Sequence, residues 1–279
     1  MDFGPGRPPR ADGNSSDADA GSTQTKRDPF DWAGAARYDL EYKKISRRYK
    51  YAHALQNRLV DCALRGGNSG AAIVVDLGCG TANDGLEILR SRRNAIYLGI
   101  DKSEAMLARA RRKLRAADFG PRSILVKADV REITATELSS IAIAHGLVPY
   151  FRCLICTLFL HHYSDKERRA VYRMARKLLT DQGVLIVTDL YANSLPFCAN
   201  QALLQEVRDV RLAIRRLGSS ASGSDTPTTL SEQHYLAENK PAELGAELCL
   251  LRSEGFSQID IPYRCGQLAI LAAHPREQT

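Results

Sequence analysis

The sequence predicts an α/β fold: a doubly wound, seven-stranded sheet that is mostly parallel and has an antiparallel C-terminal strand. A β-branched apolar run at residues 74–77 passes through Gly78 and Gly80 into an amphipathic stretch, the pattern of a buried parallel strand that turns into a helix. Further short apolar runs alternate with segments of helical spacing. Two final strand-like runs are joined by the short turn 264–266, which indicates a terminal hairpin.

Each predicted element has local support in the sequence. The second strand ends at Asp101, and Ser103 then precedes apolar positions at helical spacing, so we expect Ser103 to be a helix N-cap. After the fourth strand, Ser164 and Asp165 begin another amphipathic helix. The predicted strands are residues 74–77, 94–101, 123–130, 153–160, 182–189, 255–261 and 267–273.

The bulk composition is that of a single enzyme domain. The 279 residues are 44% hydrophobic, enough to bury a sizeable core, and doubly wound sheets form one domain at this size. No apolar run reaches the length of a membrane span, and the first residues lack the apolar core of a signal peptide. The seven cysteines form no disulfide framework, and Cys153 and Cys156 would point to opposite faces of one strand. We therefore expect a cytoplasmic protein without membrane contact, and we predict no metal site.

The glycine turn after the first strand indicates a nucleoside-binding site. A dinucleotide fingerprint would need a small residue at the position of Asn83, which closes the G-x-G-x-x-G pattern. No tyrosine in the chain has a lysine four residues later, as short-chain dehydrogenases require. These two departures argue against an NAD enzyme. A strand-to-helix turn without any ligand remains the alternative.

An aspartate, Asp76, stands two residues before the G-x-G and no third glycine follows, which resembles motif I of the class I S-adenosylmethionine (SAM) dependent methyltransferases. In that family the glycine turn, here Gly78 and Gly80, approaches the methionine portion of SAM, and the acidic residue contacts its ammonium directly or through water. The phrase at residues 99–107 is similar to the family's GxDxSxxML signature. Its carboxylate, Asp101, follows the turn by about twenty residues, a spacing suited to accepting the ribose hydroxyls.

The resemblance implies further cofactor contacts. Asp129 ends an Ala-Asp pair that in the family accepts from the adenine amine, while the backbone N–H of Val130 donates to the ring. Alternatively, Asp129 caps the helical turn at Thr134. Tyr38 stands in a Tyr-Asp pair similar to the family's N-terminal element, whose aromatic ring closes over the methionine of SAM. The remaining predicted cofactor-binding residues are Lys102, Met106 and Thr157.

The loop after the fourth strand carries the candidate catalytic residues. His161 and His162 resemble the Leu-His-His loop of the ubiquinone and small-molecule methyltransferase branch, which lies beside the transferred methyl group. Imidazole titrates near neutral pH, so either histidine could act as a general base, although methyl transfer relies more on alignment than on a base. A structural histidine bonded to a loop carbonyl is the alternative. Weaker candidates for the acceptor site are His234, Tyr235, Trp32, Tyr42, Tyr191, Asn193 and Phe197.

The composition and the resemblance together suggest a domain layout. Residues 1–28 have almost no large apolar side chains, so we expect a disordered tail before a methyltransferase domain at 29–279. Within that domain the family implies an N-terminal helical lid at 29–66 and a helical acceptor cap at 190–254. The polar stretch 218–230 is expected to be a flexible loop in this cap, either a lid or a tolerated insertion.

The net charge of +7, with basic runs at 43–50 and 109–115, raises the question of an RNA partner. No RNA-binding signature accompanies either run, so we rank a nucleic-acid substrate below a solvated polar helix face. The leading hypothesis is SAM-dependent methyl transfer to a nitrogen or oxygen of a small molecule. The alternatives are a tRNA-directed or carboxy-SAM-forming enzyme of the same fold, and a non-catalytic SAM-fold binding protein. The sequence predicts no particular oligomeric state.

Overall fold

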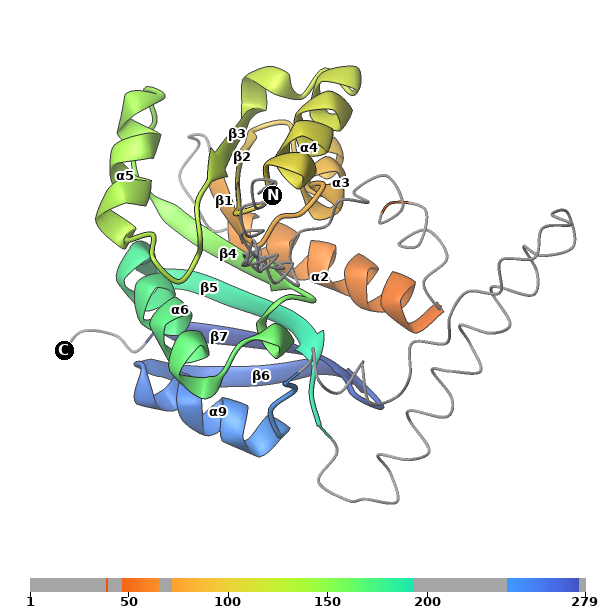
Figure 1. Ribbon diagram of the computed structural model, residues 1–279, viewed down its shortest axis with the longest axis vertical. Coiled ribbons are helices and arrows are strands. Elements are labelled where there is room, and N and C mark those ends of the chain that lie inside the picture. The colour runs from red at the N-terminus through yellow and green to blue at the C-terminus, as the bar shows by residue number, and fades with distance from the viewer. Residues whose placement is uncertain (1–38, 40–46, 66–71, 193–239, 276–279) are drawn as a thin grey trace, which may run out of the picture.

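The computed structural model describes residue 39 and residues 47–65, 72–192 and 240–275 (Figure 1). Seven strands form one sheet in the order β3-β2-β1-β4-β5-β7-β6. Only β7 runs antiparallel to its neighbours, β5 and β6, so the predicted fold class is confirmed. The strands are β1 Ala72–Leu77, β2 Ala95–Asp101, β3 Ser123–Lys127, β4 Phe151–Thr157, β5 Leu179–Leu190, β6 Phe256–Cys265 and β7 Leu268–Pro275.

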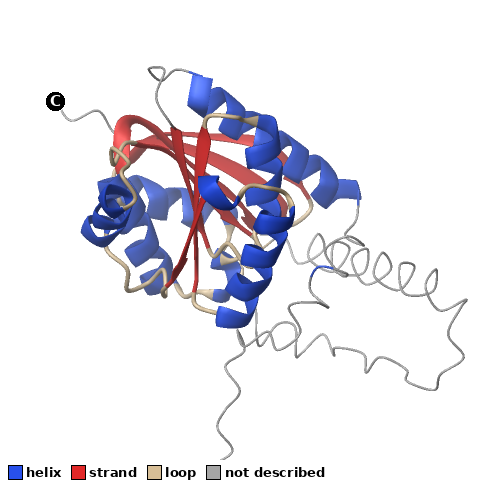
Figure 2. Cartoon of the chain, turned by 90° about the horizontal axis from the view of Figure 1, so that it is seen from above, coloured by secondary structure: helices blue, strands red, loops and turns tan. Residues whose placement is uncertain are grey.

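Helices cover both faces of the sheet (Figure 2). The buried side chains of α2 (Arg47–Arg65), α3 (Asn83–Ser91) and α4 (Glu104–Ala116) pack in one apolar cluster against the sheet. Those of α5 (Ala135–Ala144), α6 (Asp165–Leu178) and α9 (Leu244–Ser253) belong to the cluster on the opposite face. Two short 3₁₀ helices, η1 (Gly120–Arg122) and η2 (Leu160–His162), complete the described elements.

Successive side chains of the central strands point to opposite faces of the sheet, which explains why these strands are mostly apolar on both faces. In β4, Cys153 lies in the cluster of α2 to α4, whereas Cys156 lies in the cluster of α5, α6 and α9. Both faces of a parallel strand are buried under helices, so both sets of side chains are apolar. The two thiols therefore point to opposite faces, as predicted.

Local chemistry sets several helix starts as expected. The Ser103 side chain accepts from the N–H of Met106 at 3.3 Å and begins α4. Ser164 and Glu167 form a capping box at the start of α6. One alternative was that Asp129 caps the helical turn at Thr134. The structure differs, because Thr134 is itself the N-cap of α5 and pairs with Glu137 in a capping box. Asp129 therefore does not cap this helix.

Strand ends differ from the sequence-based bounds where the chain turns early. β3 ends at Lys127 because Asp129 begins a turn, its carbonyl accepting the N–H groups of Glu132 and Ile133 at 3.0 Å each. β4 ends at Thr157 because Leu158 adopts a φ of 51° ahead of η2. Both early turns fall at the carboxyl edge of the sheet.

Parts of the expected lid and cap pack on the sheet. Ala52, Gln56 and Val60 of α2 are buried, and Ala52 and Val60 belong to the apolar cluster of α2 to α4. Leu244 and Leu251 of α9 are buried in the same way, so residues 244–253 of the expected cap also cover the sheet. The expected tail 1–28 and loop 218–230 lie outside the described residues. In the described part of the chain, no helix combines the length and apolarity that crossing a bilayer would need.

Candidate functional site

The candidate site lies where the order of strands reverses. β1 pairs with β2 on one side and with β4 on the other, and in such sheets ligands bind at the carboxyl ends of the strands beside this point. The carboxyl ends of β1 to β3, with the loops that follow them, are called the cofactor side below. The ends of β4 and β5, with the starts of α6 and α9, are called the acceptor side.

The glycine turn begins the cofactor side. Gly78 has a φ of 76°, and its N–H donates to the carbonyl of Ile100 at 2.9 Å. A side chain there would meet the Phe159 ring, because a Cβ would lie 2.7 Å from it. Gly80 has a φ of 52° and no atom within 4 Å of a Cβ position, so its backbone is open to an approaching ligand.

A third glycine in this region escaped the sequence analysis. Gly85, in the first turn of α3, lies so close to the Tyr97 ring that a Cβ would be 2.5 Å from it. The close approach of helix and strand that a dinucleotide site obtains from its third glycine is provided here two residues later. The sequence indicated this close approach only by the presence of a glycine two residues after Asn83.

Asp76 is held at the end of β1 beneath the turn. It is 2% exposed and accepts a hydrogen bond from the Tyr97 hydroxyl at 2.6 Å. Burial raises the pKa of Asp76 well above its ordinary value, and the neighbouring charge of Asp84 adds to this rise. Burial and two neighbouring carboxyl groups, Asp84 and Asp101, thus oppose the ionised form of Asp76.

Asp84 joins a polar cluster with α2 that the sequence did not reveal. His53 Nδ1 lies 2.9 Å from Asp84 Oδ1, and Thr157 Oγ1 donates to Gln56 Oε1 at 3.2 Å. Burial opposes the charged form of His53, but the Asp84 carboxylate outweighs it and raises the pKa of His53. Burial likewise works against ionisation of Asp84, yet His53 lowers the pKa of that carboxyl. The predicted residue Thr157 is thus beside the glycine turn, in contact with a helix whose amphipathic sequence carried no sign of a site.

Asp101 lies across from the glycine turn at the end of β2. Its Oδ2 accepts the N–H of Gly80 and its Oδ1 accepts the N–H of Ser103, both at 2.8 Å. Burial raises the pKa of Asp101, against the lowering effect of these N–H groups. Each carboxylate oxygen has a second lone-pair direction, so both retain capacity for ligand hydroxyls.

Asp129 lies at the far end of the cofactor side and is paired with Arg131. The guanidinium contacts both carboxylate oxygens, with Nε 2.9 Å from Oδ1, and this pairing lowers the pKa of Asp129. Lys102 lowers the pKa of Asp129 as well. Val130 and Met106 are buried, at 3% and 4% exposure.

Asp39 connects the N-terminal part of the chain to this side. Thr81 Oγ1 donates to Asp39 at 2.6 Å, Lys113 Nζ donates at 3.1 Å, and Arg109 Nε also donates to this carboxylate. Burial opposes ionisation, but these donors together lower the pKa of Asp39. Two residues of the basic run 109–115 thus bind a carboxylate instead of forming a wholly solvated face. The predicted residue Tyr38 lies outside the described residues.

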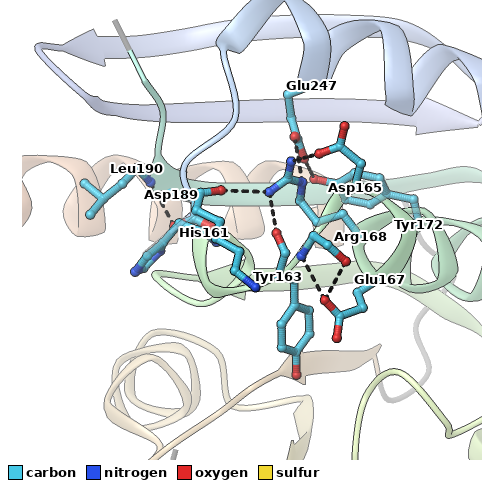
Figure 3. A network of polar contacts seen from close by, with 11 residues as sticks. His161, Tyr163, Asp165, Glu167, Arg168, Tyr172, Asp189, Leu190 and Glu247 are labelled. Carbon is cyan, nitrogen blue, oxygen red and sulfur yellow. Dashed lines mark hydrogen bonds and ion pairs between the residues drawn. The ribbon is translucent and has the colours of Figure 1, made fainter. Parts of the chain in front are cut away.

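On the acceptor side, His161 has a carboxylate partner that the sequence did not predict. Its Nδ1 lies 2.5 Å from Asp189 Oδ1, and its N–H donates to Oδ2 at 3.0 Å (Figure 3). The N–H of Leu190 also donates to Oδ1, at 2.8 Å. The ring centroid of His162 is 4.1 Å from that of His161. Asp189 was visible in the sequence only as the last residue of a predicted strand.

The weaker candidates for the acceptor site are either buried in the core or outside the described residues. Tyr191 is 3% exposed and packs in the core cluster of α5, α6 and α9. No group of three metal-ligating side chains occurs among the described residues. The candidates Trp32, Tyr42, Asn193, Phe197, His234 and Tyr235 lie outside the part that the structure describes.

Comparison with known proteins gives consistent results. Residues 75–185 match the family described as "Methyltransferase domain". The chain is 30% identical over 121 residues to carboxy-S-adenosyl-L-methionine synthase of Nautilia profundicola, covering 42% of this chain and 50% of that protein. It is 34% identical over 131 residues to the synthase of the same name from Sulfurimonas denitrificans, covering 47% and 53%. The chain thus spans about half the length of these two relatives.

A solved structure extends the similarity of fold over most of the chain. The magnesium protoporphyrin IX methyltransferase of Synechocystis PCC 6803 with bound SAH superposes with a TM-score of 0.56. The match covers 88% of this chain and 95% of that one, at 17% sequence identity. At this identity the match is evidence for the fold alone.

Proposed function

We propose that the chain, whose residues 75–185 match a methyltransferase domain, is a class I SAM-dependent methyltransferase and transfers a methyl group from SAM to a nitrogen or oxygen of a small molecule. One observation carries the proposal. An acidic, open glycine turn on the cofactor side lies one strand away from a buried histidine-carboxylate pair on the acceptor side. A donor site and a proton acceptor thus share one edge of the sheet.

The residues of the cofactor side fit SAM. Asp76, Asp84 and Asp101 bring three carboxyl groups together, and His53 Nδ1 lies 2.9 Å from Asp84. Burial and then repulsion from Asp84 and Asp101 raise the pKa of Asp76, and SAM, with positive charge on its sulfonium and its ammonium, would offset both effects. The open backbone at Gly80 suits close approach of the methionine portion.

We assign the remaining contacts by the same chemistry. Asp101 would hold the ribose hydroxyls with the lone pairs that its two backbone donors leave. Asp129 and the backbone of Val130 would contact adenine, and the adenine amine would share the carboxylate with Arg131. Lys102, Met106, Thr157 and Tyr38 complete the proposed cofactor set. SAM supplies a methyl group already activated by its sulfonium, so the main task of these residues is alignment.

His161 is the proposed base. Asp189 accepts the backbone N–H groups of His161 and Leu190, and because a carboxylate only accepts, its contact with the ring assigns the proton to Nδ1 of His161 and leaves Nε2 as the basic nitrogen. Nε2 would take the proton that an acceptor hydroxyl or amine loses on methylation, and Asp189 would stabilise the resulting imidazolium. His162, whose ring centroid lies 4.1 Å from that of His161, is the alternative.

A second function in the same fold is favoured by the two named relatives. Both are carboxy-SAM synthases, and each aligns with less than half of this chain. Mass spectrometry of the ligand that co-purifies with the full chain separates the two: SAM or its demethylated product supports methyl transfer, and a carboxylated SAM supports the synthase.

Isothermal titration of SAM into the purified chain tests the cofactor site. We expect Asp101→Asn to weaken binding about tenfold to a hundredfold, because hydrogen bonds to a charged group contribute about 1.5–3 kcal/mol. Asp181→Asn, at an exposed position near the other end of the sheet, is the matched control. Equal affinity in the two variants would refute the assignment of Asp101.

Transfer itself is measured with methyl-labelled SAM and a panel of hydroxyl and amine acceptors. Product formation with at least one acceptor is expected. Tight SAM binding without transfer to any of them would favour a non-catalytic binding protein, and transfer to tRNA alone would favour the tRNA-directed alternative.

A further inference from the structure

A buried ion pair joins two helices of the acceptor side. Arg168 of α6 and Glu247 of α9 are 3% and 2% exposed, and Arg168 Nε lies 3.1 Å from Glu247 Oε2 (Figure 3). The Tyr172 hydroxyl also donates to Glu247. Burying two charges costs several kcal/mol each, and apolar residues of similar volume often give equal stability. Stability alone is therefore a weak explanation for this pair.

The guanidinium of Arg168 also binds the backbone around the proposed base. Nη1 donates to the carbonyl of Tyr163 at 2.7 Å and to that of Lys240 at 3.2 Å, while Nη2 lies 2.5 Å from Asp165 Oδ1. Tyr163 follows His161 by two residues. The planar fork of an arginine can hold several acceptors in fixed directions, which the single ammonium of a lysine does not do.

Lys240 connects this guanidinium to His161 itself. The Lys240 N–H donates to the His161 carbonyl at 2.5 Å, while the Lys240 carbonyl accepts from Arg168. Lys240 is also where the described chain resumes after residues 193–239. The described residues on either side of that segment lie close together, because the N–H of Ala192 donates to the carbonyl of Ala242 at 2.8 Å.

We propose that Arg168 is a positioning residue that fixes the backbone of the His161 loop and joins it to the point where the chain returns from residues 193–239. His161 is then held on its ring by Asp189 and on its backbone by Lys240, and Arg168 fixes Lys240 and Tyr163 together. The inference rests on the proposed function in one respect, since it takes His161 as the base. Its consequence is that the backbone at Lys240 and the proposed base respond to one buried side chain.

The test compares the unaltered chain with Arg168→Lys, which keeps the charge but loses the fork. The first measurement is amide hydrogen exchange at Lys240. We expect exchange to speed up about tenfold or more, the size that follows from losing one hydrogen bond to a charged group. The second is the imidazole N–H resonance of His161 in labelled protein, identified by its absence in His161→Gln. We expect this resonance to broaden or disappear in Arg168→Lys.

Arg169→Lys is the matched control. Arg169 is the next residue of α6 and also binds near the end of α9, through Ser253 at 2.9 Å and Glu254 at 2.7 Å. No contact with the His161 loop or with Lys240 is recorded for it in the described residues. Both signals should therefore stay unchanged in this variant, which separates a positioning role from general loosening between the two helices.

A second variant covers the case in which Arg168→Lys does not fold. Arg168→Met with Glu247→Gln removes both buried charges and keeps an acceptor for Tyr172, and it should show the same two changes. Unchanged Lys240 exchange and an unchanged His161 resonance in the variants that fold would overturn the proposal. Neither readout needs an acceptor, so a failed proposed function appears separately, as absence of methyl transfer by the unaltered chain.

Discussion

The two sides of the site differ in how far apart in the sequence their partners lie. On the cofactor side, the contact between Gly80 and Asp101 spans 21 residues, within one strand-helix-strand unit. On the acceptor side, Arg168 reaches Lys240 across 72 residues and Tyr172 reaches Glu247 across 75. A site built from neighbouring segments leaves a motif in the sequence. A site built by packing distant helices leaves only isolated polar residues.

Around the glycine turn, too, some residues were predicted from the sequence and others were not. Asp76, Gly78, Gly80 and Asp101 belong to one continuous stretch and were predicted. Gln56 of α2 contacts Thr157, at the end of the neighbouring β4, across 101 residues, and that contact was not predicted. Asp189 was missed as well, although it lies only 28 residues from His161, because a carboxylate at the end of a strand does not reveal its partner.

The largest expected effect tests the acceptor side. Asp189→Asn should lower kcat about a hundredfold to ten-thousandfold with a responsive acceptor, because His161 loses the carboxylate that sets its tautomer. SAM affinity, measured by titration, should stay the same, since Asp189 makes no recorded contact with the glycine turn. His162→Gln is the control. A larger loss of kcat in that control than in Asp189→Asn would assign the base to His162.

Substitution of the glycine turn tests the cofactor side. Gly78→Ala should lower the free energy of unfolding by about 2–5 kcal/mol, because a positive φ and overpacking against Phe159 both oppose the methyl group. Gly80→Ala meets only the backbone cost of about 1–2 kcal/mol. Urea unfolding of both variants measures the difference. Equal losses would mean that Phe159 moves aside at no cost.

Asp39 tests whether the N-terminal part of the chain is bound to the cofactor side. Asp39→Asn should lower the free energy of unfolding by about 1.5–3 kcal/mol, since charge-assisted bonds to Arg109 and Lys113 are lost. Glu104→Gln, which breaks an exposed pair with Arg111 on the same helix, should change it much less, because water screens exposed charges. Thermal unfolding compares the two. An Asp39→Asn effect no larger than that of Glu104→Gln would contradict this anchoring role.

The smallest effect concerns Glu167, which links the two sides because Arg131 bridges it to Asp129. Hydrogen bonds from Ser164, and then from Arg131, lower the pKa of Glu167 to about 2. A carboxyl whose pKa is lower in the folded state stabilises the fold above its unfolded value near 4.5 and stops doing so as the pH falls towards 2.

The unaltered chain should therefore be more stable than Glu167→Gln at pH 7, and the difference should shrink between about pH 4.5 and 2. Urea unfolding at several pH values measures it. A difference that stays constant over this range would mean that Glu167 titrates normally in the folded chain.

Most of the fold could be predicted from the sequence, and the exceptions have local causes. The seven strands and the caps at Ser103 and Ser164 depend on short patterns, and they appear in the structure. The ends of β3 and β4 were misplaced because turns at Asp129 and Leu158 interrupt sequences that remain apolar. The packing of α2 on the sheet could not be predicted, because an amphipathic helix has the same sequence pattern whether it covers a sheet or a cofactor.

The sequence by itself determined the class of fold, the glycine turn and the carboxylates that end the first three strands, because strand-to-helix turns are encoded by adjacent residues. Tertiary structure decided which histidine meets a carboxylate, which arginine is buried, and which basic residues bind Asp39. These depend on helix packing and on the order of strands in the sheet, which bring together residues that share no local pattern. The glycine turn, its carboxylates and the histidines at 161 and 162 could therefore be predicted from the sequence, whereas the pairing of His161 with Asp189 depends on β4 and β5 lying side by side.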